Sequence, residues 1–329
     1  MDFSPHDERW KLQDSVYSDE LARRMVWLSG WLPYQQCQQV FEQIGERHIP
    51  SSSIWRQTQA QGSRRVSRTQ QQRQQVSLEL VKLPDAVHDH DQRKGVSMDG
   101  GMVNLRQRGW CELKVGTVFD VEQRLERDVQ TQQLTQQAHA TKVGYTAVLG
   151  SKDAFAPALW ALAVEQHVPT AQTSCVCADG AAWIWNLADE YFPVSRQIVD
   201  WFHATQHLAD AAHALYPDVT DSHKCSAWLK TYKDHLYMGR LHTIIACLHK
   251  RNRADLAIYF EHHQRRMQYL EFREEGLPIG SGTVESGVKQ FKQRLTGAGM
   301  RWNAPAAERM IVIRAAVLGN TFNMLWDAA

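Results

Sequence analysis

Three acidic residues, far apart in the chain, have the types and surroundings needed to hold divalent metal ions. Asp99 and Asp179 are both followed by glycine, Asp179 directly follows the apolar run 173–178, and Glu285 lies in a late segment of helical periodicity. Hard cations such as Mg²⁺ prefer carboxylate oxygens and keep waters or phosphate oxygens as their remaining ligands. Three carboxylates therefore suffice to hold a pair of ions together with a phosphodiester.

Each of these residues also fits a structural role. Asp-Gly is a tight-turn signal, so Asp99 and Asp179 fit turns as well as metal ligands. Glu285 fits an acid at a helix start, although no Ser or Thr stands three residues before it to complete a capping box. The three acids follow one another as an aspartate on a first strand, an aspartate on a central strand and a glutamate on a late helix. This order favours a site that all three share.

The segments around these acids predict a mixed α/β sheet flanked by helices. We expect Asp99 to end the first strand and Asp179 to end a central parallel strand buried on both faces. Open α/β sheets place active sites at strand ends, so both carboxylates are expected at one gap. The predicted strands are 95–103, 111–121, 145–150, 173–178 and 196–201, and the predicted helices are 155–167, 183–191, 203–215, 283–295 and 304–318.

The interval between Asp179 and Glu285 is far longer than one strand and one helix require. Residues 219–275 carry helical patterns and no strand signal, which predicts an all-helical insertion before the helix that carries Glu285. Basic residues of this insertion favour a surface that faces nucleic acid, whereas its many acids favour an ordinary solvated surface.

The first 62 residues predict helices, the third of which begins after Ser51–Ser53 and ends near Gly62. Two short helices joined by a tight turn match a helix-turn-helix, and a helical hairpin that only packs is the alternative. The Gln- and Arg-rich segment 63–93 predicts a linker. The basic residues expected to contact phosphates here are Arg56, Arg64, Arg65 and Arg68.

Composition narrows the class of protein. The 329 residues are 43% apolar, and no run reaches the roughly 18 to 20 apolar residues that a membrane span needs. The start lacks a signal-peptide pattern, so we expect an intracellular protein. Six cysteines in a chain of this length predict structural thiols and no disulfide scaffold. With a net charge of +1, local basic faces predict an anionic partner held at defined places.

The chain resembles a known family, the DDE transposases of bacterial insertion sequences, most closely those of the ISKra type. The resemblance spans residues 21–318, nearly the whole chain. The segments that carry it are Ser97-Met-Asp-Gly-Gly-Met-Val103, Trp110-Cys-Glu-Leu-Lys-Val-Gly116, Ala178-Asp-Gly-Ala-Ala-Trp-Ile184, Phe192-Pro193, Asp200-Trp-Phe-His-Ala-Thr-Gln-His-Leu208, Leu277-Pro-Ile-Gly-Ser-Gly-Thr-Val-Glu-Ser286, Lys289-Gln-Phe-Lys292 and Gly299-Met-Arg-Trp302.

The resemblance implies a ribonuclease-H-like core in which Asp99, Asp179 and Glu285 are the catalytic triad. Two divalent ions, Mg²⁺ or Mn²⁺, would activate a water for in-line attack at the transposon end and stabilise the leaving oxygen. The freed 3′-hydroxyl would then attack target DNA. Asp200 and His203 resemble a Cys/Asp-x-x-His signature and are expected to support the site rather than to react.

The resemblance also implies the partners. Lys289, Lys292 and Arg301 are expected to contact DNA, because Lys289 and Lys292 follow Glu285 by one and two helical turns. The expected partner is double-stranded DNA, both transposon ends and target, bound by a homodimer or higher oligomer in the bacterial cytoplasm at the nucleoid. Relatives usually carry further N-terminal sequence, often a cysteine-based zinc element, so we expect a truncated copy.

Two alternatives to a transposase stay open. One is another ribonuclease-H-like nuclease, such as a junction resolvase, and the other is a non-catalytic DNA-binding protein descended from a transposase. On the favoured interpretation the chain divides into a helix-turn-helix region (1–62), a linker (63–93), the first part of the core (94–218), the helical insertion (219–276) and the helices that complete the core (277–329).

Overall fold

A mixed five-stranded sheet forms the centre of the molecule. The computed structural model describes residues 17–76, 92–128 and 130–327. The sheet has the order β3-β2-β1-β4-β5, with β1, β2 and β3 antiparallel and β4 parallel to both β1 and β5. The strands are β1 (Arg93–Leu105), β2 (Gly109–Arg127), β3 (Leu134–Leu149), β4 (Thr173–Ala178) and β5 (Arg196–Val199). The predicted mixed α/β sheet is confirmed.

The two faces of the sheet are covered by different helices. Alternation along β1 turns Val96 and Met98 toward a core shared with α5 (Lys152–Glu165) and α6 (Ala182–Tyr191). Val103 turns the other way and packs with α12 (Gly282–Leu295) and α13 (Ala304–Leu318). Asp99 shares the parity of Val103, so it lies on the face that α12 covers.

The third strand was predicted to begin at residue 145, and this start is wrong because the Gln-rich residues before it also belong to the sheet. β3 begins at Leu134 and pairs with β2 along its whole length, from Arg127↔Leu134 to Leu113↔Leu149. Glutamine is a poor indicator of strands, but a partner strand that is already extended supplies the missing hydrogen bonds. Tertiary pairing therefore outweighs local propensity here.

The N-terminal helices pack against α13 rather than standing apart from the core. They are α2 (Asp19–Trp31), α3 (Tyr34–Gln43) and α4 (Ser51–Gln75). A methyl group built on Gly62 would lie 2.6 Å from Cβ of Arg309, so this glycine permits the close crossing of α4 and α13. The predicted end near Gly62 and the predicted linker are wrong for residues 63–75, which continue α4; residues 77–91 lie outside the described residues.

The predicted all-helical insertion is confirmed. After α7 (Trp201–Leu215) the chain forms α8 (Ser222–Tyr237), α9 (Leu241–Lys250), α10 (Ala254–His262) and α11 (Tyr269–Glu274), with 3-10 turns before α8 and before α11. The last helix is α14 (Phe322–Asp327). No helix in the described ranges has the length and apolar character required to cross a membrane.

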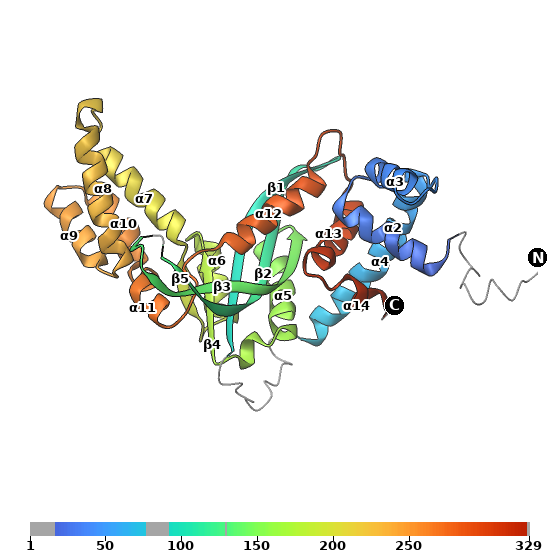
Figure 1. Ribbon diagram of the computed structural model, residues 1–329, viewed down its shortest axis with the longest axis horizontal. Helices are drawn as coiled ribbons and strands as arrows, with labels where there is room; N and C mark the ends of the chain where they lie inside the picture. Colours follow the sequence, from blue (N-terminus) through green and yellow to red (C-terminus); the bar gives the residue numbers. More distant parts are fainter. Residues whose placement is uncertain (1–16, 77–91, 129, 328–329) are drawn as a thin grey trace, which may run out of the picture.

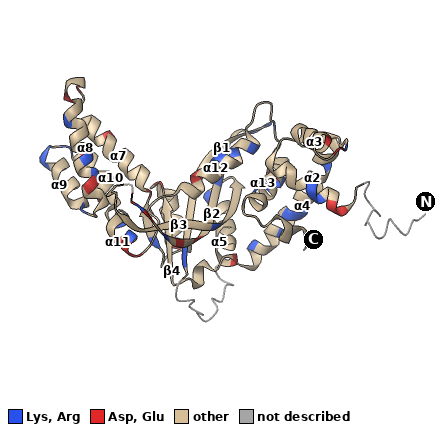
Figure 2. Ribbon diagram, viewed as in Figure 1, with Lys and Arg blue, Asp and Glu red and all other residues tan. Residues whose placement is uncertain are grey.

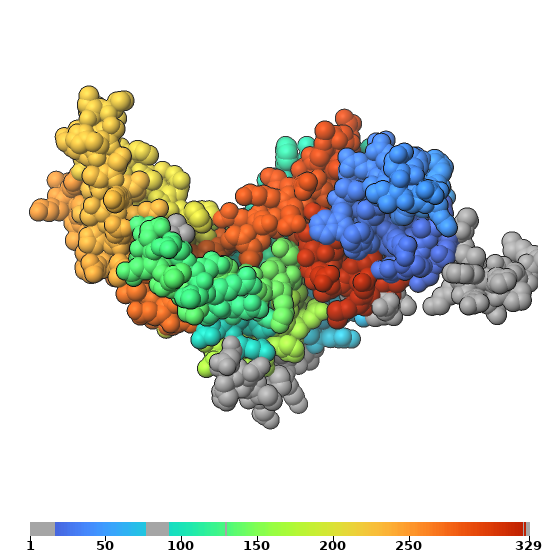
Figure 3. Space-filling view, viewed as in Figure 1, coloured from blue at the N-terminus to red at the C-terminus, as the bar shows by residue number. Residues whose placement is uncertain are grey.

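The molecule has the outline of a wide V. Figure 1 shows the insertion helices on one arm and the N-terminal helices on the other, with the sheet between them. The starts of α7 and α12 meet at the bottom of the V (Figure 1), and Figure 3 shows the broad hollow above them. Any group near these two helix starts is therefore positioned at the floor of a concave surface.

Candidate active site

Strand register places three aspartates at one level of the sheet. β1 and β4 pair in parallel up to Val96↔Val176, and three more residues in this register bring Asp99 level with Asp179. β4 and β5 pair up to Ala178↔Val199, so the next residues, Asp179 and Asp200, are also level. Neighbouring strands lie about 4.8 Å apart, so the three side chains start from adjacent positions at one edge.

The prediction that Asp99 ends its strand is wrong. Asp99 lies in the middle of β1, opposite Val115 of β2. The reason is the long antiparallel partner, since β2 keeps β1 extended after β4 has ended. The level of Asp99 is nevertheless the one at which β4 stops, so the expected neighbourhood with Asp179 is retained.

The carboxylates act on one another electrostatically. Burial raises the pKa of Asp99, and the negative charges of Asp179 and Glu285 raise it further, against the opposing effects of the Gly100 amide and of His203. The Gly100 N–H donates to Asp99 Oδ1 at 2.6 Å. In the part of the chain that the structure describes, none of the three predicted ligands forms an ion pair with Lys or Arg. This mutual repulsion favours a divalent cation. However, the structure does not bring the predicted triad into one close group: among the described residues, Asp99 and Asp179 lie outside the group of possible ligands within 4.8 Å of one another.

Asp179 is oriented by the turn that follows it. The Ala181 N–H donates to Asp179 Oδ1 at 2.9 Å, and Gly180 has a φ of 104°, which only glycine adopts without strain. A methyl group on Gly180 would lie 3.6 Å from the Tyr259 hydroxyl and 3.7 Å from His263 Nε2. The turn role and the ligand role are thus compatible, and the insertion helix α10 packs directly against this turn.

The buried carboxylate of Asp200 accepts four hydrogen bonds that join two segments of the chain. Its side chain is completely buried. Oδ1 accepts from the backbone N–H of His203 at 3.0 Å and from Nδ1 of His203 at 3.2 Å, while Oδ2 accepts from the Ser281 N–H at 2.5 Å and the Ser281 hydroxyl at 2.9 Å. Asp200 therefore caps α7 and ties its start to the turn that leads into α12.

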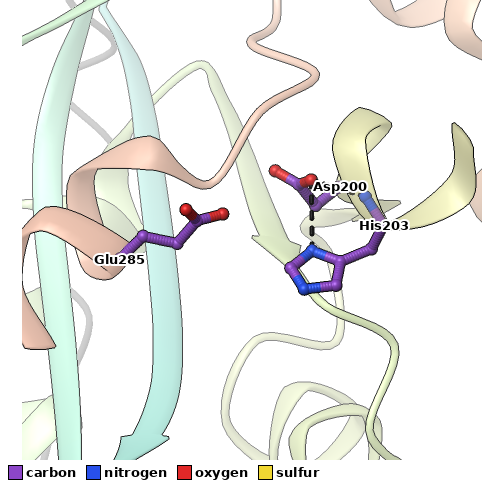
Figure 4. Close-up of side chains that lie close together, drawn as sticks. All are labelled: Asp200, His203 and Glu285. Atoms are coloured by element: carbon purple, nitrogen blue, oxygen red, sulfur yellow. Dashed lines mark hydrogen bonds and ion pairs between the residues drawn. The ribbon is translucent and has the colours of Figure 1, made fainter. Parts of the chain in front are cut away.

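Asp200, His203 and Glu285 converge at the floor of the hollow. Among residues 17–76, 92–128 and 130–327, one ligand atom from each of these three lies within 4.8 Å of the other two. Figure 4 shows Glu285 extending from α12 toward the hydrogen-bonded Asp200–His203 pair. Since both oxygens of Asp200 already accept two hydrogen bonds, we interpret Asp200 as an anchor and Glu285 as the free carboxylate of this group.

The helix that carries Glu285 is seated on the sheet by its other residues. Val284 and Val288 are buried, and the Thr283 hydroxyl lies 3.1 Å from that of Thr117 on β2. Lys289 and Lys292 are exposed, and Figure 2 marks basic positions in blue along the ribbon of α12. Cδ of Lys292 lies 3.5 Å from where a methyl group on Gly101 would stand, so its stem rests on β1 near Asp99.

The arginines predicted to bind DNA have different surroundings. Arg56, Arg64 and Arg301 are exposed, and Arg68 is half-buried. Arg65 is buried, donates to the Phe322 carbonyl at 3.2 Å and stacks over the Phe322 ring at 4.8 Å. This packing leaves Arg65 unavailable to a phosphate, so its predicted role in DNA binding is wrong.

Sequence reasoning missed two contributions to this site. Ser281 donates from its backbone N–H and its hydroxyl to Asp200, a role that its Gly-Ser-Gly surroundings in the sequence do not indicate. Tyr259 and His263 of the insertion approach the Asp179 turn, and no local pattern marks them. Both contributions depend on contacts between distant segments. Comparison of the chain with protein-family models and with curated proteins finds no match.

Proposed function

We propose that this protein is a DNA transposase of the DDE type, which cuts DNA strands at transposon ends and joins them to target DNA. Two observations carry the proposal. The register of β1 and β4 puts Asp99 at the same level of the sheet as Asp179. Burial raises the pKa of Asp99, and the negative charge of Glu285, on the helix that covers this face, raises it further. On this proposal, carboxylates from β1, β4 and α12 would act together at one edge of the sheet, next to the Asp200–His203 pair that lies close to Glu285.

The architecture supports the same proposal. A mixed sheet of order β3-β2-β1-β4-β5, with three antiparallel strands, two parallel ones and a late helix across one face, is compatible with the proposed ribonuclease-H-like core. The long helical insertion separates Asp179 from Glu285 in sequence while the fold brings both to the same edge. A resolvase or a non-catalytic descendant is favoured by no observation on this structure.

The residues have distinct tasks on this proposal. Asp99, Asp179 and Glu285 would hold two divalent ions, Mg²⁺ or Mn²⁺, and their mutual repulsion fits such cations. When bound, such ions activate water and stabilise a leaving oxygen at phosphorus. Asp200 and Ser281 hold the starts of α7 and α12 together, and so keep Glu285 facing the sheet. His203 is oriented by Asp200 beside Glu285 and can hold a proton there.

Double-stranded DNA is the proposed substrate, bound by a dimer or higher oligomer. Lys289 and Lys292 follow Glu285 along the exposed side of α12, where each can neutralise a phosphate of the strand leading to the site. Arg56, Arg64 and Arg301 extend this basic surface toward the arm of the N-terminal helices, with Arg68 at its margin. The concave surface between the two arms gives a duplex access to the carboxylates (Figure 3).

The deciding experiment uses DNA that carries the sequences flanking the gene, with Mg²⁺ or Mn²⁺ and separate measurements of binding, cleavage and strand transfer. Asp179→Ala is expected to lower cleavage by about 10³-fold or more while DNA binding persists, because it removes a proposed metal ligand and leaves the basic residues in place. Asp210→Ala is the matched control, since Asp210 is an exposed acid on α7. Undiminished cleavage by the Asp179 variant would overturn the proposal, and cleavage without strand transfer would indicate a nuclease.

A further inference from the structure

A groove of about 790 Å³ lies between the N-terminal helices and the turn that joins α12 to α13. Four separate segments contribute to its walls: the start of α3, the start of α4, Arg106 in the β1–β2 turn, and residues 298–303. Figure 1 shows the α12–α13 turn beside α3 on the arm of the V that faces away from the insertion. The groove is therefore separate from the carboxylate site, although α12 connects the two.

The lining of the groove is mixed. It contains the three arginines Arg106, Arg294 and Arg301, and no Asp or Glu is among the described residues that line it. Amide, hydroxyl and apolar side chains stand between them, and Trp55 is 47% exposed at one wall. The charge of this lining complements an anion rather than a cation.

One of the arginines is fixed in the groove wall by its surroundings. Arg294 is 2% exposed; its Nε donates to the Ser29 carbonyl at 2.7 Å, and its guanidinium lies over the rings of Tyr34 and Trp302. Arg294 and the buried Tyr34 hydroxyl interact with each other electrostatically. Arg294 therefore adds a fixed positive charge to the wall, and Arg106 and Arg301 are the arginines exposed to the groove.

The first turn of α4 adds to the positive potential. This helix runs for 25 residues, and Ser51 and Ser52 of its first turn line the groove. Pro50 precedes it and supplies no side-chain cap, while the Ser51 N–H donates to Gln38 Oε1 at 2.9 Å. The partial positive charge that remains at this long helix start faces the same space as the arginines.

We propose that this groove binds a phosphodiester stretch of the backbone of double-stranded DNA, an inference that rests on the proposed function. Ten residues of α12 separate Glu285 from Leu295, which spans about 15 Å. This is less than half of the roughly 34 Å turn of a duplex, so one DNA molecule reaches from the carboxylates through Lys292 to the groove.

The test compares two arginines of the same turn. Arg106 lines the groove and Arg108 does not, and both are exposed. The backbone N–H of Arg106 donates to the Trp302 carbonyl at 2.7 Å, so the turn stays in place when only the side chain is removed. Binding of mixed-sequence duplex is measured against salt without divalent ions. Arg106→Ala is expected to lower the slope of log affinity against log salt by about 0.9, and Arg108→Ala to leave it unchanged.

Three outcomes contradict the proposal in different ways. Equal slopes for Arg106→Ala, Arg108→Ala and the parent would remove the groove from the DNA path while leaving the proposed function standing. A parent protein that binds no duplex would overturn the proposed function itself. If inorganic phosphate raises the Tm of the parent but not of Arg106→Ala, and DNA affinity is the same for both, the groove holds free phosphate instead of DNA.

Discussion

Asp200 and His203 belong to one motif but differ in burial and in hydrogen bonding. Asp200 is completely buried and accepts four hydrogen bonds, from His203 and Ser281, whereas the His203 side chain is 41% exposed. The first is required for folding of this edge, and the second is available to the solvent and to the substrate.

Substitution of these two residues is expected to separate stability from activity. Asp200→Ala would leave buried donors of Ser281 and His203 unpaired and would remove the cap of α7, at a cost of about 2–4 kcal/mol in the free energy of unfolding. His203→Ala is expected to cost less than about 1 kcal/mol but to lower DNA cleavage. Urea unfolding and a cleavage assay measure the two effects. Equal destabilisation by both variants would contradict the assigned roles.

Lys292 is predicted to act on DNA without contributing to the fold. Its stem rests on β1 near Gly101, and its ammonium group is exposed without an ion pair in the described ranges. Lys292→Ala should therefore change the Tm little and lower both the affinity for end DNA and strand transfer. The control is Lys152→Ala, which removes an equally exposed lysine from α5. The same DNA affinity for both variants, at low and moderate salt, would refute the prediction.

At the scale of elements, the helical insertion is held to the sheet through Asp128. This residue, 1% exposed at the end of β2, accepts from the backbone N–H groups of Gln130 at 2.9 Å and Thr131 at 2.7 Å, and from the Tyr237 hydroxyl of α8. Arg273 of α11 lies 3.8 Å from the same carboxylate and stacks over Tyr237. A single buried acid thus joins the β2–β3 hairpin to two insertion helices.

Loss of this anchor should loosen the insertion and change its response to acid. Burial acts to raise the pKa of Asp128, but hydrogen bonds from Tyr237, Thr131 and Gln130 outweigh it and hold the pKa below its usual value. A lowered pKa stabilises the folded state at neutral pH, and this contribution disappears as the pH falls below about 3.9, the usual value for aspartate.

Tyr237→Phe is expected to cost about 1–2 kcal/mol and to increase amide exchange in α8, and Asp128→Asn to reduce the acid sensitivity of unfolding. Thr231→Val, which alters an exposed position of the same helix, is the control. Unchanged exchange in α8 after loss of the Tyr237 hydroxyl would show that the insertion is held by apolar packing alone.

At the scale of the whole molecule, the N-terminal helices are part of the folded body. Ala22 and Val26 of α2 pack in one cluster with Ile313 and Val317 of α13. Removal of residues 1–91 would expose this apolar surface of α13, so the shortened chain is expected to aggregate. Retained solubility and an unchanged Tm would contradict this expectation.

DNA binding by the N-terminal helices is therefore better tested with single substitutions. Arg56→Ala and Arg64→Ala remove exposed charges from α4 and should each lower the salt slope of DNA affinity by about 0.9. Arg65→Ala should instead lower the Tm, because its guanidinium packs on Phe322 inside the molecule. An unaltered salt slope for both exposed variants would identify the helical region as a packing element only.

The sequence alone was enough to predict the limits of those strands and helices that depend on neighbouring residues only. Strand 173–178 and helix 304–318 have the predicted limits, because a continuous apolar run and an Asn-Ala-Pro helix start are features of neighbouring residues. The position of Asp179 at a strand end follows from the same local pattern. The helical character of the insertion was likewise visible in its periodicity.

Only the tertiary structure decided the features that depend on distant partners. The Gln-rich part of β3 is a strand because β2 pairs with it, α4 continues beyond Gly62 because α13 crosses it there, and Arg65 is buried because Phe322 covers it. The hydrogen bonds between Asp200 and Ser281 join segments 81 residues apart. Local periodicity records which face of an element is apolar but not what covers that face, so these contacts could not be predicted from the sequence.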